Sequence, residues 1–147
     1  MSMFDSFDIN ASGLTAQRYR MDVISENIAN VDTTRTEDGT PYRRKSVVFQ
    51  EKGQGLRFSD ALSKATGTYR GAGVKVVSTF EDTTTDLKMV YDPAHPDADE
   101  NGYVSYPNVD VITEMTNLID ASRSYEANAT AFNASKSMAV KGLEMGK

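Results

Sequence analysis

The sequence has 147 residues, of which 39% are hydrophobic and 25% are charged, and it contains no cysteine. These values suit one folded domain, and they exclude a disulfide framework and a zinc site built on thiolates. The net charge of -5, from 16 basic and 21 acidic residues, argues against nucleic acid as a partner, because phosphate binding requires a basic surface.

Targeting and membrane segments are not apparent in the sequence. No stretch approaches the roughly 18 consecutive apolar residues that a membrane-spanning helix requires. The first residues lack the basic head and the apolar run of a secretory signal peptide. We therefore expect neither direct insertion into a membrane nor a cleaved signal.

Apolar residues recur at every seventh position near the N-terminus, at Phe7, Leu14, Met21 and Ile28. This spacing places them on one face of a helix that we expect to span residues 6 to 30. A polar run rich in asparagine, aspartate and threonine follows, and it predicts the end of the helix.

The middle of the chain contains all four prolines and most of the glycines, so it must turn repeatedly. Short runs with β-branched residues predict strands at residues 46–50, 74–80, 87–91 and 103–106. Asp38-Gly39 and Asn101-Gly102 predict turns. The predicted irregular segments are loops at 53–55 and 67–73, and a short helix or loop at 58–64.

The last segment shows mainly apolar residues at steps of four and three from Val111 to Leu143, interrupted by the polar Ser122 and Lys136. Such a pattern is typical of helices that pack along their whole length. Asn108 is the predicted N-cap, and Asp110 would lie at the positive end of the helix dipole.

The two predicted helices differ in length. At 1.5 Å per residue they would span roughly 38 Å for residues 6 to 30 and roughly 54 Å for residues 108 to 143. An antiparallel pair would leave about ten residues of the longer helix uncovered, including Ala139 and Leu143 and with them Phe132 near the edge. The spacing alone fits both a self-contained helical hairpin and assembly with copies or relatives of the chain.

Three stretches resemble one protein family. Ser25-Glu-Asn-Ile-Ala-Asn-Val-Asp-Thr33 resembles the N-terminal signature of the bacterial flagellar axial proteins, the rod and hook family. Residues 92–110 look like a stretch that distinguishes a proximal rod member, and residues 114–138 are similar to the C-terminal helix of the family. Asp32-Thr-Thr-Arg35 departs from the usual Asn-Thr-Thr-Gly of the family.

This resemblance implies a structural subunit of the rod, the hollow shaft of the flagellar basal body that crosses the periplasm. It also implies export through the flagellar type III apparatus without a cleaved signal. The expected partners are other copies of the chain and other rod proteins. Terminal helices that pack against neighbouring subunits would then cover the apolar stripe that the length difference leaves open.

Two motifs suggest other functions. Asp97-Ala-Asp99-Glu-Asn101-Gly102 matches the first half of an EF-hand calcium loop, but its twelfth position is Asn108 rather than glutamate. His95-Pro96-Asp97 matches the tripeptide of J-domains, but a strand-like run precedes it. Because His95 is the single histidine, a site with several histidines is excluded. We expect neither enzymatic activity nor a cofactor.

We predict an α+β fold with a terminal helical assembly domain, residues 1–35 and 107–147, and a β-rich domain, residues 36–106. The predicted assembly interface consists of Leu14, Met21, Asn27, Ile28, Asn30, Leu118, Tyr125 and Phe132. The two asparagines would end the first helix and bind neighbouring molecules. The alternative is a monomeric module that binds a cation or another ligand through the acidic loop at residues 92–102.

Overall fold

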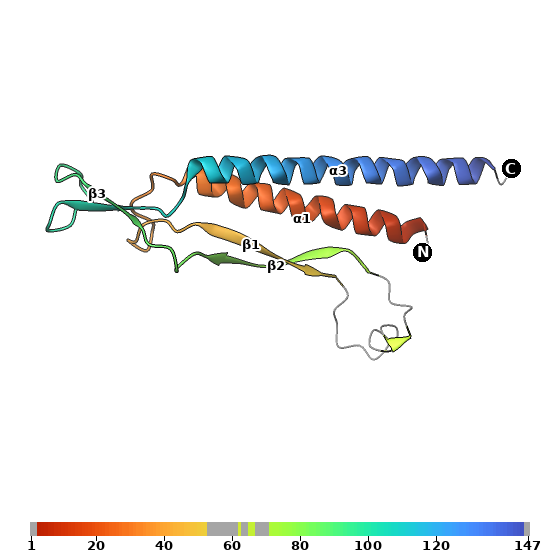
Figure 1. The fold of residues 1–147 in the computed structure, drawn as a ribbon, viewed down its shortest axis with the longest axis horizontal. Coiled ribbons are helices and arrows are strands. Elements are labelled where there is room, and N and C mark those ends of the chain that lie inside the picture. Colours follow the sequence, from red (N-terminus) through yellow and green to blue (C-terminus); the bar gives the residue numbers. More distant parts are fainter. Residues whose placement is uncertain (1–2, 53–61, 63–64, 67–70, 146–147) are drawn as a thin grey trace. The chain divides into compact units, whose positions relative to one another are not determined.

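A computed structural model describes residues 3–52, 62, 65–66 and 71–145 of the chain. The element order within these residues is α1 (Met3–Ala29), β1 (Lys45–Glu51), β2 (Val74–Glu81), β3 (Lys88–Tyr91), β4 (Tyr103–Tyr106) and α3 (Val111–Glu144) (Figure 1). The predicted α+β fold and the predicted strands are confirmed. The predictions for residues 53–55, 58–64 and 67–70 fall almost entirely outside the described residues, and residues 71–73 have no regular secondary structure, as predicted.

The chain forms two compact units, each assembled from separate segments. Unit 1 comprises Met1–Tyr19, Val48–Ser78 and Ala121–Lys147, and unit 2 comprises Arg20–Val47 and Thr79–Asp120. Both units therefore contain a segment of α1 and a segment of α3, together with strand residues. The predicted division into a helical and a β-rich domain remains a prediction.

Helix α1 ends at the polar run that the sequence analysis identifies. The Asn30 amide donates a hydrogen bond from Nδ2 to the Glu26 carbonyl at 2.9 Å, and Asn30 Oδ1 accepts one from the Thr33 hydroxyl at 3.1 Å. A side chain that bonds the last turn and the following loop stops the helix in a defined conformation. Gly39, with φ of +75°, makes the predicted turn before β1.

The strands form two separate two-stranded sheets, β1 with β2 and β3 with β4. Lys52 N donates to Gly73 O and Asp82 N donates to Arg44 O, which are the two ends of an antiparallel pair. Strands β3 and β4 are also antiparallel, with Tyr91 opposite Tyr103. Gly102, with φ of +81°, closes the predicted turn just before β4.

Helix α3 begins two residues later than expected, and Asn108 is not its N-cap. Asp110 caps the helix instead: Asp110 Oδ2 accepts hydrogen bonds from Thr113 N at 3.3 Å and from the Thr113 hydroxyl at 2.6 Å. The prediction for Asn108 is wrong because tertiary contacts, described below, occupy its side chain. Asp110 can cap α3 because an N-cap needs only a short side-chain oxygen near the free amides of the first turn.

The apolar core is small and lies mainly in unit 2, where it includes Val23, Ile24, Tyr42, Val104 and Val109. Among the described residues of unit 1, the buried apolar side chains are those of Ala16 and Ala121. Alanine lets α1 and α3 approach closely but buries little area. None of the helices in the described part of the chain is long and apolar enough to cross a membrane.

Candidate functional site

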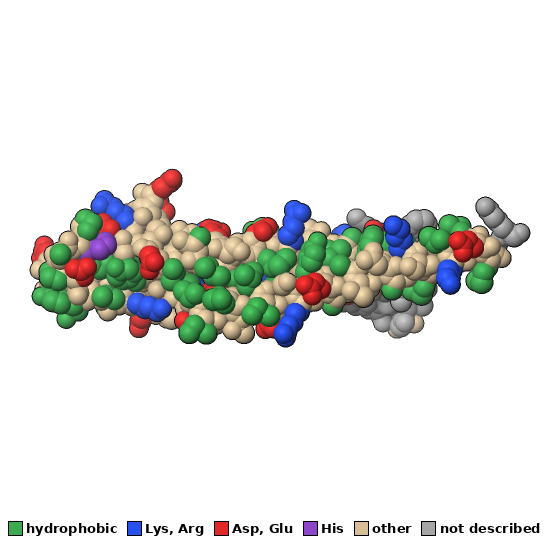
Figure 2. Space-filling model, turned by 90° about the horizontal axis from the view of Figure 1, so that it is seen from above, with side chains coloured by type: hydrophobic (Ala, Val, Ile, Leu, Met, Phe, Trp, Pro, Cys, Tyr) green, Lys and Arg blue, Asp and Glu red, His purple; other side chains and the backbone are tan. Residues whose placement is uncertain are grey.

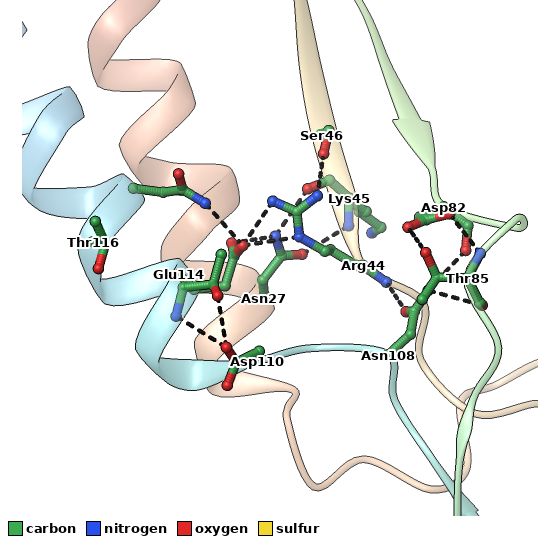
Figure 3. Close-up of polar contacts among 12 residues, drawn as sticks. Asn27, Arg44, Lys45, Ser46, Asp82, Thr85, Asn108, Asp110, Glu114 and Thr116 are labelled. Carbon is green, nitrogen blue, oxygen red and sulfur yellow. Dashed lines mark hydrogen bonds and ion pairs between the residues drawn. The ribbon is translucent and has the colours of Figure 1, made fainter.

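A cluster of polar side chains lies in unit 2, where the end of α1, the start of β1 and the start of α3 meet (Figure 3). We call Asn27, Tyr42, Arg44, Asn108 and Glu114 the polar cluster. Burial of polar side chains is unfavourable unless their hydrogen bonds are satisfied, so each member must have partners inside the chain.

Asn27 is the centre of this arrangement, and its side chain has no exposed surface. Its Nδ2 donates to Lys45 O at 2.8 Å and to Glu114 Oε2 at 2.9 Å. Its Oδ1 accepts from Lys45 N at 2.9 Å and from the Tyr42 hydroxyl at 2.9 Å. The amide thus pairs with the Lys45 backbone as a neighbouring strand would.

Glu114 is the fully buried acidic residue of the cluster. Its Oε1 accepts hydrogen bonds from Arg44 Nε at 2.9 Å and from Arg44 Nη2 at 2.8 Å, while Oε2 faces Asn27. The guanidinium also donates from Nη1 to the Ser46 hydroxyl at 3.0 Å. A buried carboxylate is tolerated here because a cation and an amide compensate its charge.

Asn108 extends the cluster toward the turn after β2. Its Oδ1 accepts from Arg44 N at 2.8 Å, and its Nδ2 donates to Asp82 O at 3.0 Å and to Thr85 O at 3.3 Å. Burial, together with the nearby Glu26 carboxylate, raises the pKa of the Tyr42 hydroxyl well above its usual range. Tyr42 therefore remains a hydrogen-bond donor at physiological pH.

The chemistry of the polar cluster is structural. It joins three segments that are far apart in the chain, and the donors and acceptors of Asn27 are fully used. That leaves the Asn27 amide no free group for a neighbouring molecule in this conformation. Sequence reasoning missed Glu114 and Arg44; the available signal was an acidic residue seven positions before Ala121, on the inner face of α3.

The apolar residues of the predicted interface share one property: all of them are half-buried in the chain. They are Leu14, Met21 and Ile28 on α1, and Leu118, Tyr125 and Phe132 on α3. In unit 1 the Phe132 ring packs edge-to-face on Phe7, with 5.2 Å between ring centroids. Asn30, also half-buried, lies just beyond the end of α1.

Helix α3 exposes large apolar side chains at both of its ends. Ile112 is 77% exposed near the start, and Leu143 and Met145 are 70% and 86% exposed near the end. Figure 2 shows hydrophobic side chains gathered between charged ones on one face of the molecule. Leu143 is uncovered as the length difference predicts, whereas Ala139 is half-buried.

The carboxylates of the acidic loop at residues 92–102 mainly bind its own backbone and nearby side chains. Asp99 Oδ1 accepts from Asn101 N and Tyr103 N, both at 2.8 Å. Asp97 accepts from the Thr34 hydroxyl at 2.8 Å and lies 3.7 Å from the Arg35 guanidinium. In the described ranges, no three His, Asp or Glu side chains are placed to hold a metal ion.

Asp82 organises the turn that Asn108 contacts. Its carboxylate accepts hydrogen bonds from the hydroxyl and backbone N of both Thr84 and Thr85, at 2.7 to 3.0 Å. The Thr85 hydroxyl is the largest cause, followed by the Thr84 hydroxyl, and together these bonds hold the pKa of Asp82 far below its usual value of 3.8.

A depressed pKa in the folded state predicts acid sensitivity. The stabilisation by the Asp82 carboxylate is complete above the pKa of the unfolded chain, and it is lost as the pH falls below about 4. We expect Asp82→Asn to unfold at a lower urea concentration than the wild type at pH 7. On acidification, the further loss of stability should be smaller for Asp82→Asn than for the wild type. Equal pH slopes of the urea midpoint for Asp82→Asn and the wild type would contradict this. Asp86→Asn is the matched control, because the Asp86 carboxylate accepts no hydrogen bond from the described residues.

Comparison with known proteins connects both helices to one kind of protein. Residues 7–35 match the family described as flagella basal body rod protein, and residues 100–145 match the family described as flagellar basal body rod FlgEFG protein C-terminal. The chain is 51% identical to the flagellar basal-body rod protein FlgC of Bacillus subtilis over the full length of both. It is 46% identical to the FlgC protein of Salmonella typhimurium, also over both full lengths. It is 48% identical to the FlgC protein of Borreliella burgdorferi, covering 94% of this chain and 93% of the relative.

Proposed function

We propose, from the premise that this chain belongs to the FlgC family of flagellar basal-body rod proteins, that its two terminal helices form the surface through which it joins the rod. The chain is a structural subunit of that rod. The observation that supports a helical surface is the exposure of Ile112 and Leu143 on α3 and of Met145 directly after it. An apolar helix face of this kind is stabilised when neighbouring helices cover it.

The proposed interface keeps the residues predicted from the heptad spacing: Leu14, Met21, Ile28, Leu118, Tyr125 and Phe132, with Asn30 at the end of α1. Their half-buried state supports this role, because each side chain still has surface that a neighbouring helix can cover. We place Asn27 behind the interface, where it holds the end of α1 in the polar cluster.

The proposed partners are further copies of the chain and other rod proteins, with the type III export apparatus acting before assembly. Residues 1–35 and 107–147 would form the assembling part, and residues 36–106 the β-rich part. The family is structural. Four of the five side chains of the polar cluster are buried, and the cluster makes its hydrogen bonds to groups of the chain that serve the fold. We infer that the chain acts by assembly and has no enzymatic activity.

Replacing Leu143 with aspartate tests this interface without disturbing the fold. Leu143 is 70% exposed, so a carboxylate there should leave the stability of the free chain unchanged. In an assembled helical layer the same carboxylate would be buried without a partner, which is strongly unfavourable. We expect Leu143→Asp and Phe132→Asp to abolish incorporation into isolated basal bodies and to abolish swimming.

Circular dichroism and urea unfolding of the purified variants distinguish an effect of the substitution on folding from an effect on assembly. Phe132→Asp should also weaken the chain, since its ring packs on Phe7, whereas Leu143→Asp should not. Glu144→Asp keeps the charge on the same turn and is the control. Wild-type swimming and normal incorporation of Leu143→Asp would show that the end of α3 is not part of the interface.

A further inference from the structure

A groove of about 350 Å³ lies in unit 1 beside α1. Ser12, Ala16 and Tyr19 line it from one face of the helix, and Val74 and Val76 line it from the start of β2. Ser12 Oγ accepts a hydrogen bond from Val74 N at 3.0 Å, which holds the strand against the helix. Since a cavity of roughly 150 Å³ is enough for an aromatic ring, the groove has room for a large side chain.

Two lysines, Lys52 and Lys75, also line this groove. Both are exposed, and neither ammonium group pairs with a carboxylate of the described residues. The chain as a whole carries a net charge of -5. Two cations beside an apolar groove therefore favour a partner that combines apolar side chains with acidic ones.

The β3–β4 hairpin in unit 2 presents such side chains. Met89, Val90, Tyr91 and Tyr103 are 56%, 46%, 64% and 43% exposed. The rings of Tyr91 and Tyr103 stack edge-to-face across the two strands, with 5.3 Å between their centroids. Tyrosine and methionine are enriched in interface cores, and a preformed aromatic pair loses little conformational entropy on binding.

Charge distinguishes the hairpin from the exposed apolar surfaces at the two ends of α3. Residues 86–103 contain five acidic residues against one lysine, a net charge of -4, which becomes -3 when the Arg35 guanidinium, 3.7 Å from Asp97, is counted. The start of α3, residues 110–123, carries three acidic residues against Arg123, but one of the three, Glu114, is buried and paired. The end of α3, residues 136–145, carries Lys136 and Lys141 against Glu144 and is therefore basic. The lysine-lined groove thus complements the hairpin best.

We propose that the groove of one molecule receives the β3–β4 hairpin of a second copy of this chain, with Tyr91 inserted and acidic residues facing Lys52 and Lys75. This contact rests on the proposed assembly function and identifies one pair of surfaces within it. Because the two surfaces differ, a contact leaves one groove and one hairpin unoccupied, and it can be repeated in a growing assembly. The hairpin therefore takes part in assembly together with the helices.

The absence of cysteine from the chain makes cross-linking a direct test. One variant carries Thr15→Cys in the groove wall, and the other carries Met89→Cys, on the same face of β3 as Tyr91. Both are produced in the same cells, and their basal bodies are isolated and treated with a short bismaleimide. We expect a dimer only when both variants are present. Thr15→Cys combined with Thr40→Cys, at an exposed position outside the helices and the hairpin, is the control pair.

Incorporation of each variant into basal bodies is measured first. Normal incorporation with no more dimer than in the control pair would overturn the contact and leave the proposed rod function intact. Loss of swimming in Leu143→Asp tests the rod interface separately. A product in which Thr15→Cys is joined to a different rod protein would assign the groove to that protein and would also overturn the proposal.

A charge exchange provides the second measurement, and it is made with the purified chains. Lys52→Glu with Lys75→Glu in the groove copy should reduce the dimer yield roughly fivefold, because two attractive charge pairs become repulsive. Asp86→Lys with Glu100→Lys in the hairpin copy should restore it. An unchanged yield after the first exchange, or no recovery after the second, would contradict the assigned orientation of the hairpin.

Discussion

Replacing Glu114 with alanine should lower the free energy of unfolding by about 2 kcal/mol, because it removes the buried partner of an ion pair whose other member, Arg44, is 30% exposed. The Arg44 guanidinium would lose the carboxylate that both Nε and Nη2 contact. The Asn27 amide would lose one acceptor at a position with no exposed surface, and water could not replace it easily. The effect is measured as the shift of the urea unfolding transition.

Removal of both charges should be less damaging than removal of one. Replacement of a buried ion pair by apolar residues of similar size is often close to neutral, whereas a single unpaired charge is strongly unfavourable. We therefore expect Glu114→Leu combined with Arg44→Leu to be more stable than Glu114→Leu alone. Glu126→Ala, at an exposed position of α3, is the control and should change stability by less than about 0.5 kcal/mol.

An additive double variant would contradict this account. Additivity would mean that Glu114 and Arg44 stabilise the fold independently, in spite of the 2.8 Å contact between them. For a rod subunit the cluster has a direct consequence, because it holds the end of α1 and the start of α3 on β1. Variants that break it should also reduce incorporation into basal bodies.

Replacing Gly73 with alanine should destabilise the chain by about 2 kcal/mol or more, since a residue with a Cβ is strained at positive φ and the new atom has no space. Gly73 has φ of +96°. A Cβ there would clash with Ser12 Oγ and would lie 3.3 Å from the Ile9 Cα. Ser12 Oγ also accepts the hydrogen bond from Val74 N, so a displacement of the Ser12 side chain would weaken that bond as well.

Gly71→Ala is a closely matched control for this prediction. Among the described residues, a Cβ at Gly71 would meet Glu51 Oε1 at 3.7 Å, which is an ordinary contact. We expect Gly71→Ala to unfold at the wild-type urea concentration and Gly73→Ala to unfold well below it. Adding Ser12→Ala to Gly73→Ala should recover only part of the loss, because the positive φ and the Ile9 backbone remain. Equal stabilities of the two glycine variants would show that the close approach of β2 to α1 is unimportant.

Local sequence patterns are sufficient to predict the helices and strands of this protein. The heptad of Leu14, Met21 and Ile28 predicted α1, and β-branched runs predicted the strands, because helix and strand periodicities depend on neighbouring residues. The difference in helix length predicted that Leu143 would be uncovered, and it is 70% exposed. The resemblance of both terminal segments identifies the family from the sequence alone.

Nonlocal contacts decided the rest. Asn108 and Asp110 are both good N-caps by type, and Asp110 caps α3 because Arg44 N, Asp82 O and Thr85 O occupy the amide of Asn108. Glu114 is buried because the fold brings Arg44 and Asn27 to its carboxylate. These partners lie 70 and 87 residues away in the sequence, so no local pattern predicts them. Sequence alone therefore determined the elements and the family, since periodicity and motifs are local. Only the tertiary structure determined which polar residues are buried, because the burial of a charge depends on partners that the fold brings to it.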